Sequence, residues 1–181
     1  MVAVSGSPGK IQVLLRHRID LLPADAIPRF VYHQASEQPI AKAKELVERA
    51  TKVAADAAVG AIEQMLQDIR SRGATVKACG MLSGSTSVPN DLGTVLRSHP
   101  LIHAAEGKLF QDAIVSACKH CGLRMVLATE REVWSGAAKA LDITETGLHK
   151  EVDDLRKTVG APWGADQKSA SAVALLALRR A

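Results

Sequence analysis

The strongest constraint on the fold is one long helix. Between Pro39 and Arg72 the chain contains no further proline and one glycine, Gly60, and its apolar residues recur at helical spacing. Gly73 follows directly and is the expected stop. The charged residues of this segment are interpreted as a solvated face in preference to a binding stripe: Lys42, Lys44, Glu45, Glu48, Arg49 and Lys52.

Short apolar runs on both sides of this helix predict strands. Three lie within residues 1–34, namely Val2–Ser5, Ile11–Leu22 and Arg29–His33, and two follow the helix, Ala74–Leu82 and Leu123–Thr129. Early clustered strands imply an antiparallel meander, whereas strands that alternate with helices imply parallel pairing. The stretch SGSPGK between the first two strands is predicted to be a hairpin turn, because its glycine spacing does not fit a phosphate loop.

The remaining segments are predicted to be helical. One region runs from about 92 to 121 and is divided near His99–Pro100, and C-terminal helices cover 130–141, 144–159 and 166–180. A chain of 181 residues suits a single domain over residues 1–181. The predicted fold class is therefore α/β.

Composition removes several classes of protein. Three cysteines do not suggest a disulfide framework, so we expect a reduced, cytoplasmic protein, and the N-terminal residues do not resemble a signal peptide. The longest apolar run, Ala170–Leu178, is too short for a membrane span. A net charge of +4 permits a nucleic-acid partner, but an aromatic content of 3% argues against binding single strands by base stacking.

Cys118 and Cys121 have the spacing of metal ligands. They form one pair, whereas a closed zinc site needs four ligands. Both also lie on the helical face that carries Phe110, Ile114 and Ala117. We therefore interpret them as core residues.

A second group of metal-ligating residues starts at His99. His99, His103 and Glu106 are spaced so that they project to one side of a helix, with His99 as its cap if the helix begins at Pro100. Two imidazoles and a carboxylate on one face can bind a divalent metal. Helix capping with a polar surface stripe, and hydrogen bonding or proton transfer in a pocket, stay open as alternatives.

Two further places can contact an anion. Ser83, Gly84 and Ser85 follow a predicted strand and can cradle a phosphate with their backbone N–H groups, although a plain polar loop is the alternative. Asp166 and Lys168 open a final helix that continues in small residues, which permit a close approach to a sheet. Asp166 is then either a simple N-cap or a pocket residue near the strand ends, and Lys168 can pair with a phosphate.

The order of these elements resembles the ribonuclease H-like fold, and the C-terminal half resembles its RuvC-type Holliday-junction resolvase branch. The resemblance is carried by the glycine-containing helix AAEGKLFQDAIVSAC, the strand LRMVLA and the final helix that opens at Asp166. It implies a mixed sheet, with an antiparallel N-terminal meander followed by parallel strands, flanked by helices.

Members of that family cleave phosphodiesters with two divalent metal ions held by carboxylates. Asp166 matches the aspartate of the final helix, but Ser169 stands where a second acid is expected, and acids are missing from the first and fourth strands. The resemblance therefore implies a protein associated with DNA or RNA that has a degenerate site and weak or no nuclease activity. Glu106 and Asp166 would be acceptors or residual ligands of Mg²⁺ or Mn²⁺, with Zn²⁺ less favoured, and His103 a ligand or proton carrier.

Two other functions stay open. The first is a metal-dependent hydrolase of a small phosphorylated substrate that uses His99, His103 and Glu106 together with the loop at Ser83. The second is a non-catalytic assembly protein in which the fold is a scaffold.

Overall fold

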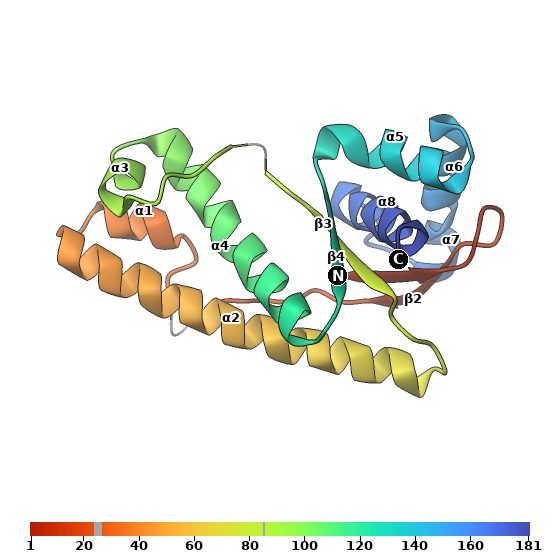
Figure 1. The fold of residues 1–181 in the computed structure, drawn as a ribbon, viewed down its shortest axis with the longest axis horizontal. Coiled ribbons are helices and arrows are strands. Elements are labelled where there is room, and N and C mark those ends of the chain that lie inside the picture. Colours follow the sequence, from red (N-terminus) through yellow and green to blue (C-terminus); the bar gives the residue numbers. More distant parts are fainter. Residues whose placement is uncertain (24–26, 85) are drawn as a thin grey trace. The chain divides into compact units, whose positions relative to one another are not determined.

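The computed structural model describes residues 1–23, 27–84 and 86–181. Within them the chain is an α/β protein that divides into two compact units, each described here by itself (Figure 1). Unit 1 comprises Met1–Ile19, Gln64–Ser83 and Gly122–Ala181, and unit 2 comprises Asp20–Glu63 and Gly84–Cys121. The single domain expected from chain length stays a prediction.

Unit 1 begins with a β-hairpin. Strands β1 (Val2–Ser5) and β2 (Gln12–Arg16) pair antiparallel. The turn between them contains Gly6 and Gly9 at φ values of 102° and 76°, which glycine adopts without the steric cost of a side chain. The predicted hairpin turn is confirmed, and the second strand ends at Arg16, well before the predicted limit of Leu22.

The second strand pair of unit 1 is parallel. β3 (Ala78–Leu82) pairs with β4 (Arg124–Ala128), in a register that runs from Ala78 opposite Arg124 to Leu82 opposite Ala128. The early antiparallel and later parallel pairing are as predicted. The described strands form two separate two-stranded sheets, however, where one mixed sheet was expected.

Unit 1 also contains the end of α2 (Ile40–Ser71) and the helices α5 (Glu130–Leu141), α6 (Glu145–Asp154), α7 (Arg156–Val159) and α8 (Ala165–Arg179). α8 packs on α5, β1 and β3, and its middle is fully buried. A Cβ atom added at Gly80 of β3 would stand 2.2 Å from the backbone oxygen of Val173 in α8. The absence of a side chain at Gly80 therefore permits a close approach between α8 and this strand, and a close approach of this helix to a sheet was expected from the sequence.

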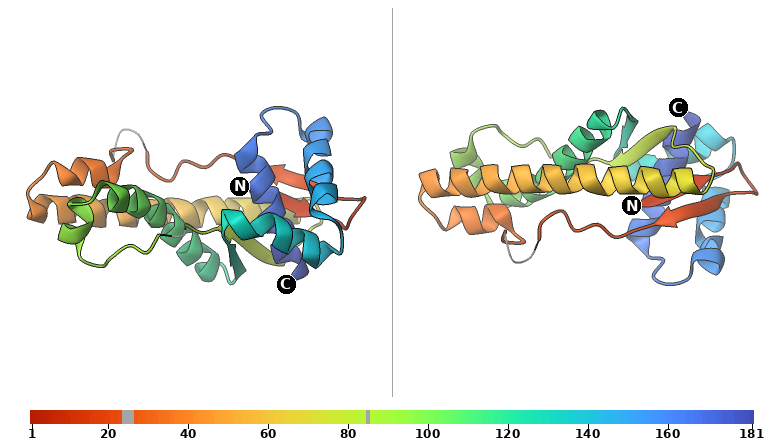
Figure 2. Two further views of the ribbon diagram at one scale, coloured as in Figure 1. Left: turned by 90° about the horizontal axis from the view of Figure 1, so that it is seen from above. Right: turned by 90° about the horizontal axis from the view of Figure 1, so that it is seen from below.

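Unit 2 is helical in its described part. It contains α1 (Val31–Ser36), the start of α2 (Ile40–Ser71), α3 (Leu92–Leu96) and α4 (His99–His120). α2 is one continuous helix, as the right view of Figure 2 shows, and it confirms the long helix predicted for residues 39–72. Its buried residues within unit 2 are four alanines and two larger side chains: Ala43, Leu46, Ala50, Ala54, Ala58 and Ile62.

The segment Arg29–His33 is not a strand. It leads into helix α1, which packs on α3 and α4. The prediction was wrong because Val31 and Tyr32 are residue types that favour strands. The side chain that caps the start of this helix belongs to a residue far away in the sequence, Glu106. In the part of the chain that the structure describes, none of the helices combines the length and the apolar character needed to span a membrane.

Candidate metal centre in unit 2

Three histidines meet at one point on unit 2. His33 comes from α1, and His99 and His103 come from the first two turns of α4. The ring centroids are 5.6 Å apart for His33 and His99, 4.8 Å for His33 and His103, and 4.4 Å for His99 and His103. The nitrogen atoms that could bind a metal all lie within 4.8 Å of one another.

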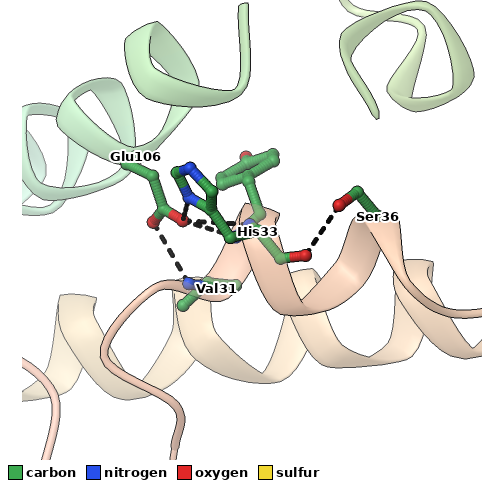
Figure 3. Close-up of polar contacts among 5 residues, drawn as sticks. Val31, His33, Ser36 and Glu106 are labelled. Carbon is green, nitrogen blue, oxygen red and sulfur yellow. Dashed lines mark hydrogen bonds and ion pairs between the residues drawn. The ribbon is translucent and has the colours of Figure 1, made fainter. Parts of the chain in front are cut away.

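Glu106 lies behind this cluster and is almost fully buried, with 9% of the residue exposed. Its carboxylate points at the first turn of α1 (Figure 3). It accepts hydrogen bonds from the backbone N–H groups of Val31 at 3.2 Å, Tyr32 at 2.8 Å and His33 at 3.2 Å. The His33 Nδ1 atom lies 3.2 Å from the same carboxylate.

These contacts explain why a short helix forms at α1. The first N–H groups of any helix have no partner inside the helix and need an outside acceptor. Phe30, at the N-cap position, makes no side-chain capping bond. Glu106 supplies the missing acceptor from α4, and its negative charge also suits the positive end of the helix dipole.

The same contact fixes how His33 is presented. A carboxylate can only accept a hydrogen bond, so the Nδ1 atom of His33 carries the hydrogen that faces Glu106. The lone pair is then on Nε2, which is the atom left to bind a metal. A carboxylate behind a ligating histidine is the usual outer partner in protein metal sites, where it sets the tautomer and the orientation of the ring.

The arrangement needs little movement to close on an ion. Two nitrogens bound to one tetrahedral zinc ion are about 3.3 Å apart. His99 and His103 are exposed, whereas His33 is half-buried and held by Glu106. The two exposed side chains are therefore the ones expected to move towards an ion, with His33 as the more fixed member.

Tyr32 carries the one clearly shifted pKa beside the cluster. Burial raises the pKa of its phenol above the usual value, and the negative charges of Glu106 and Asp112 raise it further. The phenol therefore keeps its proton over a wider pH range than a solvated tyrosine does. It adds no negative charge to the surroundings of Glu106 at neutral pH.

A pocket of about 450 Å³ adjoins the cluster and shares His103 with it. One wall is a face of α4, and the other is the loop that precedes α3. The described residues that line it are Gly84, Thr86, Ser87, Val88, His103, Ala104, Gly107, Lys108 and Gln111. Lys108 is paired with Asp112 at 2.8 Å, and both side chains are at least half exposed.

The structure brings together the three residues that the sequence proposed as a metal site, but in different roles. His99 is the first residue of α4 and not its cap, because Ser98 occupies the N-cap position. His99 and His103 face the cluster, whereas both oxygens of Glu106 accept hydrogen bonds from α1. Glu106 is therefore an outer partner of the site and not one of its three candidate ligands.

His33 was missed by the sequence analysis. It was placed at the end of a predicted strand, and it lies far from His99 and His103 in the sequence. No local pattern around it indicates a ligand. One signal could have helped. A helix that starts at Val31 needs a side chain to accept hydrogen bonds from its first N–H groups, and the neighbouring residue Phe30 cannot do this.

The other predicted site residues lie elsewhere. Asp166 lies in the first turn of α8, in unit 1, and is exposed. The N-cap of this helix is Gly164, so the prediction that Asp166 is a simple N-cap is wrong. Lys168, also in α8, forms an ion pair with Asp153 at 2.7 Å. Whether Asp166 and Lys168 act in catalysis stays a prediction.

The loop predicted to cradle a phosphate is divided. The backbone N–H of Ser83 donates to the carbonyl oxygen of Ala128 at 2.9 Å, which extends the β3–β4 pairing. Gly84 lines the pocket beside the histidine cluster. Ser85 lies outside the described residues.

Cys118 is 1% exposed on the inner face of α4, and Cys121 is the half-buried C-cap of that helix. Burial of Cys118 agrees with its interpretation as a core residue. Neither cysteine belongs to the metal-ligating group found among the described residues.

Three comparisons with known proteins were made. No protein-family model, no curated protein and no solved structure matches the chain.

Proposed function

We propose that unit 2 holds a divalent transition-metal ion and uses it to activate water for hydrolysis. The observation that carries this proposal is the convergence of His33, His99 and His103, whose ligating nitrogens lie within 4.8 Å of one another. This is the metal-dependent hydrolase left open by the sequence, with His33 in place of Glu106 as the third ligand.

The donor set indicates the kind of metal. Three neutral imidazoles suit zinc and its neighbours in the transition series, whereas Mg²⁺ and Mn²⁺ favour oxygen ligands. The order of preference expected from the sequence is therefore reversed. Three protein ligands also leave the fourth position of a tetrahedral ion open to water or substrate, as in catalytic zinc sites.

A bound ion would lower the pKa of a coordinated water towards neutrality and polarise the bond to be cleaved. The residues of the chain do the rest. Glu106 orients His33, and the two exposed histidines lie where water and a small substrate can reach them.

Zinc titration tests the metal site directly. Metal-free protein is titrated with Zn²⁺ by calorimetry, and the bound metal is counted after dialysis. We expect one ion per chain, and we expect His33→Ala, His99→Ala and His103→Ala each to lose it. His120→Ala is the matched control, because His120 is exposed at the other end of the same helix. Wild-type zinc binding in all three cluster variants would rule the site out.

Hydrolysis is tested with the zinc-loaded protein and a chromogenic ester, p-nitrophenyl phosphate. We expect turnover that needs zinc and is lost in the His103→Ala variant. Stoichiometric zinc with no turnover of any simple phosphate or carboxylate ester would leave a metal-binding protein and overturn the hydrolytic part of the proposal.

A nucleic-acid-associated protein of ribonuclease H-like architecture is the second candidate. Three observations support it. An antiparallel strand pair is followed along the chain by a parallel strand pair, and α8 packs against β1 and β3. The net charge of the chain is +4. Neither β1 nor β3 contains an acid, so weak or no metal-dependent nuclease activity is proposed with it. DNA binding that weakens steeply with added salt would favour this candidate, and binding that is absent at low salt would remove it.

A further inference from the structure

The pocket beside the histidine cluster has the dimensions of a small-molecule site. Its volume of about 450 Å³ falls within the range of roughly 300–1,000 Å³ that such sites occupy. His103 belongs both to the cluster and to the pocket wall. A molecule in the pocket would therefore contact one of the three residues that form the candidate metal site.

The lining of the pocket is selective for charge. Among the described residues that form it, the one with a full charge is Lys108, and none carries a carboxylate. Thr86 and Ser87, which also line the pocket, carry hydroxyl groups that can donate hydrogen bonds. A cationic side chain, hydroxyl donors and a neighbouring metal ion together favour an anion with several oxygen acceptors.

Lys108 is available to such an anion although it already has a partner. Its pairing with Asp112 is an ion pair within one helix, and the two side chains are 50% and 60% exposed. Exposed pairs of this kind contribute about 0–1 kcal/mol. A dianionic group in the pocket can therefore replace Asp112 as the partner of the Lys108 ammonium group with little loss of free energy.

We propose that this pocket binds the phosphate group of a small phosphate monoester, with Lys108 as its cationic contact. The inference rests on the metal centre proposed above, and it names the substrate class of that centre. The balanced step is hydrolysis. The oxygen of a water molecule would form a bond to phosphorus, and the ester P–O bond would break with its electron pair on the leaving oxygen. A proton from the water ends on that oxygen, and the products are an alcohol and inorganic phosphate.

The test uses the zinc-loaded full chain with inorganic phosphate as the probe, and it follows zinc content and phosphate affinity separately. Lys108→Gln removes the charge and keeps most of the side-chain length, and we expect it to weaken phosphate binding at least tenfold with an unchanged zinc content. Lys119→Gln is the matched control, because Lys119 is exposed on the same helix and outside the pocket. We expect this control to bind phosphate as the wild type does.

A second variant tests the pocket by its volume. A Cβ atom at Gly107 meets nothing within 4 Å, so Gly107→Leu is compatible with the helix and fills the pocket instead. We expect it to bind zinc normally, to lose phosphate binding and to raise the KM for p-nitrophenyl phosphate more than it lowers kcat.

The outcomes separate the two proposals. Normal zinc content with phosphate binding that is equal in wild type, Lys108→Gln and Gly107→Leu overturns the pocket assignment and leaves the metal centre in place. Absence of zinc from the wild-type protein overturns the metal centre itself and the substrate class that depends on it.

Discussion

Glu106 has two kinds of partner, the backbone of α1 and the imidazole of His33. The hydrogen bonds to the backbone stabilise the first turn of α1, and the contact with the imidazole determines which nitrogen of His33 is free to bind a metal. One buried carboxylate therefore both caps a helix and orients a candidate metal ligand. Changing it should alter both properties together.

We predict that Glu106→Gln lowers zinc affinity about 10–100-fold, the usual cost of losing an outer partner of a ligating histidine. An amide group keeps one acceptor and turns its NH₂ towards backbone donors, so the free energy of unfolding should also fall by about 1–3 kcal/mol. Competition titration with a chromogenic chelator and urea unfolding measure the two effects. Glu63→Gln on the exposed face of α2 is the control. Unchanged zinc affinity in the Glu106 variant would refute the outer-partner role.

Tyr32 permits a spectroscopic prediction because it is the one tyrosine of the chain. Burial raises its folded-state pKa above the ordinary value of 10.0, and the negative charges of Glu106 and Asp112 raise it further. The resulting stabilisation is therefore fully present below pH 10 and is lost as the pH rises through the folded pKa. Tyrosinate absorbance should show a midpoint above pH 10 in the folded protein that moves down towards 10 in denaturant. A folded midpoint at or below 10 would contradict the burial of this phenol.

At the scale of elements, sequence reasoning succeeded where the signals are local. α5 begins at Glu130 and ends at Leu141 as predicted, since an extended Thr129 precedes it and Asp142 ends it in the left-handed region. The long α2 was found because its spacing and its glycine stop are also local. α1 was missed because its first turn is capped by Glu106, which no pattern within residues 29–33 reveals.

The candidate site shows the same division. His99 and His103 share one helix, so their spacing predicted that they face the same way. The third ligand depends on how α1 packs against α4, and that packing is a tertiary property. The proximity of His33 to the two histidines of α4 could not be derived from either segment alone.

The contact between α8 and β3 gives a prediction about stability. Gly80→Ala places a Cβ atom 2.2 Å from the backbone oxygen of Val173, a distance that forces the helix and the strand apart. We expect a loss of about 1–3 kcal/mol, the typical cost of overpacking, measured by urea unfolding. Gly60→Ala is the control, since Gly60 lies in the exposed interior of α2 with nothing within 4 Å of an added Cβ atom. It should gain about 1 kcal/mol from helix propensity. Equal stability of the Gly80 variant and the wild type would show that the close packing is not rigid.

At the scale of the whole molecule, all candidate ligands belong to unit 2. His33, His99 and His103 and their partner Glu106 come from its two helices α1 and α4, and the described part of unit 1 contributes none. Metal binding should therefore stabilise one unit selectively.

Hydrogen exchange with and without Zn²⁺ measures this selectivity. We predict slower exchange in α1 and the first half of α4, and no change in α5 or α8, because a ligand that binds a folded segment suppresses its local opening. The His103→Ala variant, treated in the same way, should show no slowing in α1. Protection that spreads equally over α8 would contradict a centre confined to unit 2.

The capping of α1 by a residue 73 positions further along the chain also sets an order of events during synthesis. At roughly 5–20 residues per second, the ribosome makes Glu106 about 4–15 s after His33. Until then the first turn of α1 has neither its acceptor nor the two histidines of α4. A partly made chain would therefore lack two of the three candidate ligands, and any metal binding at this cluster would follow the translation of α4.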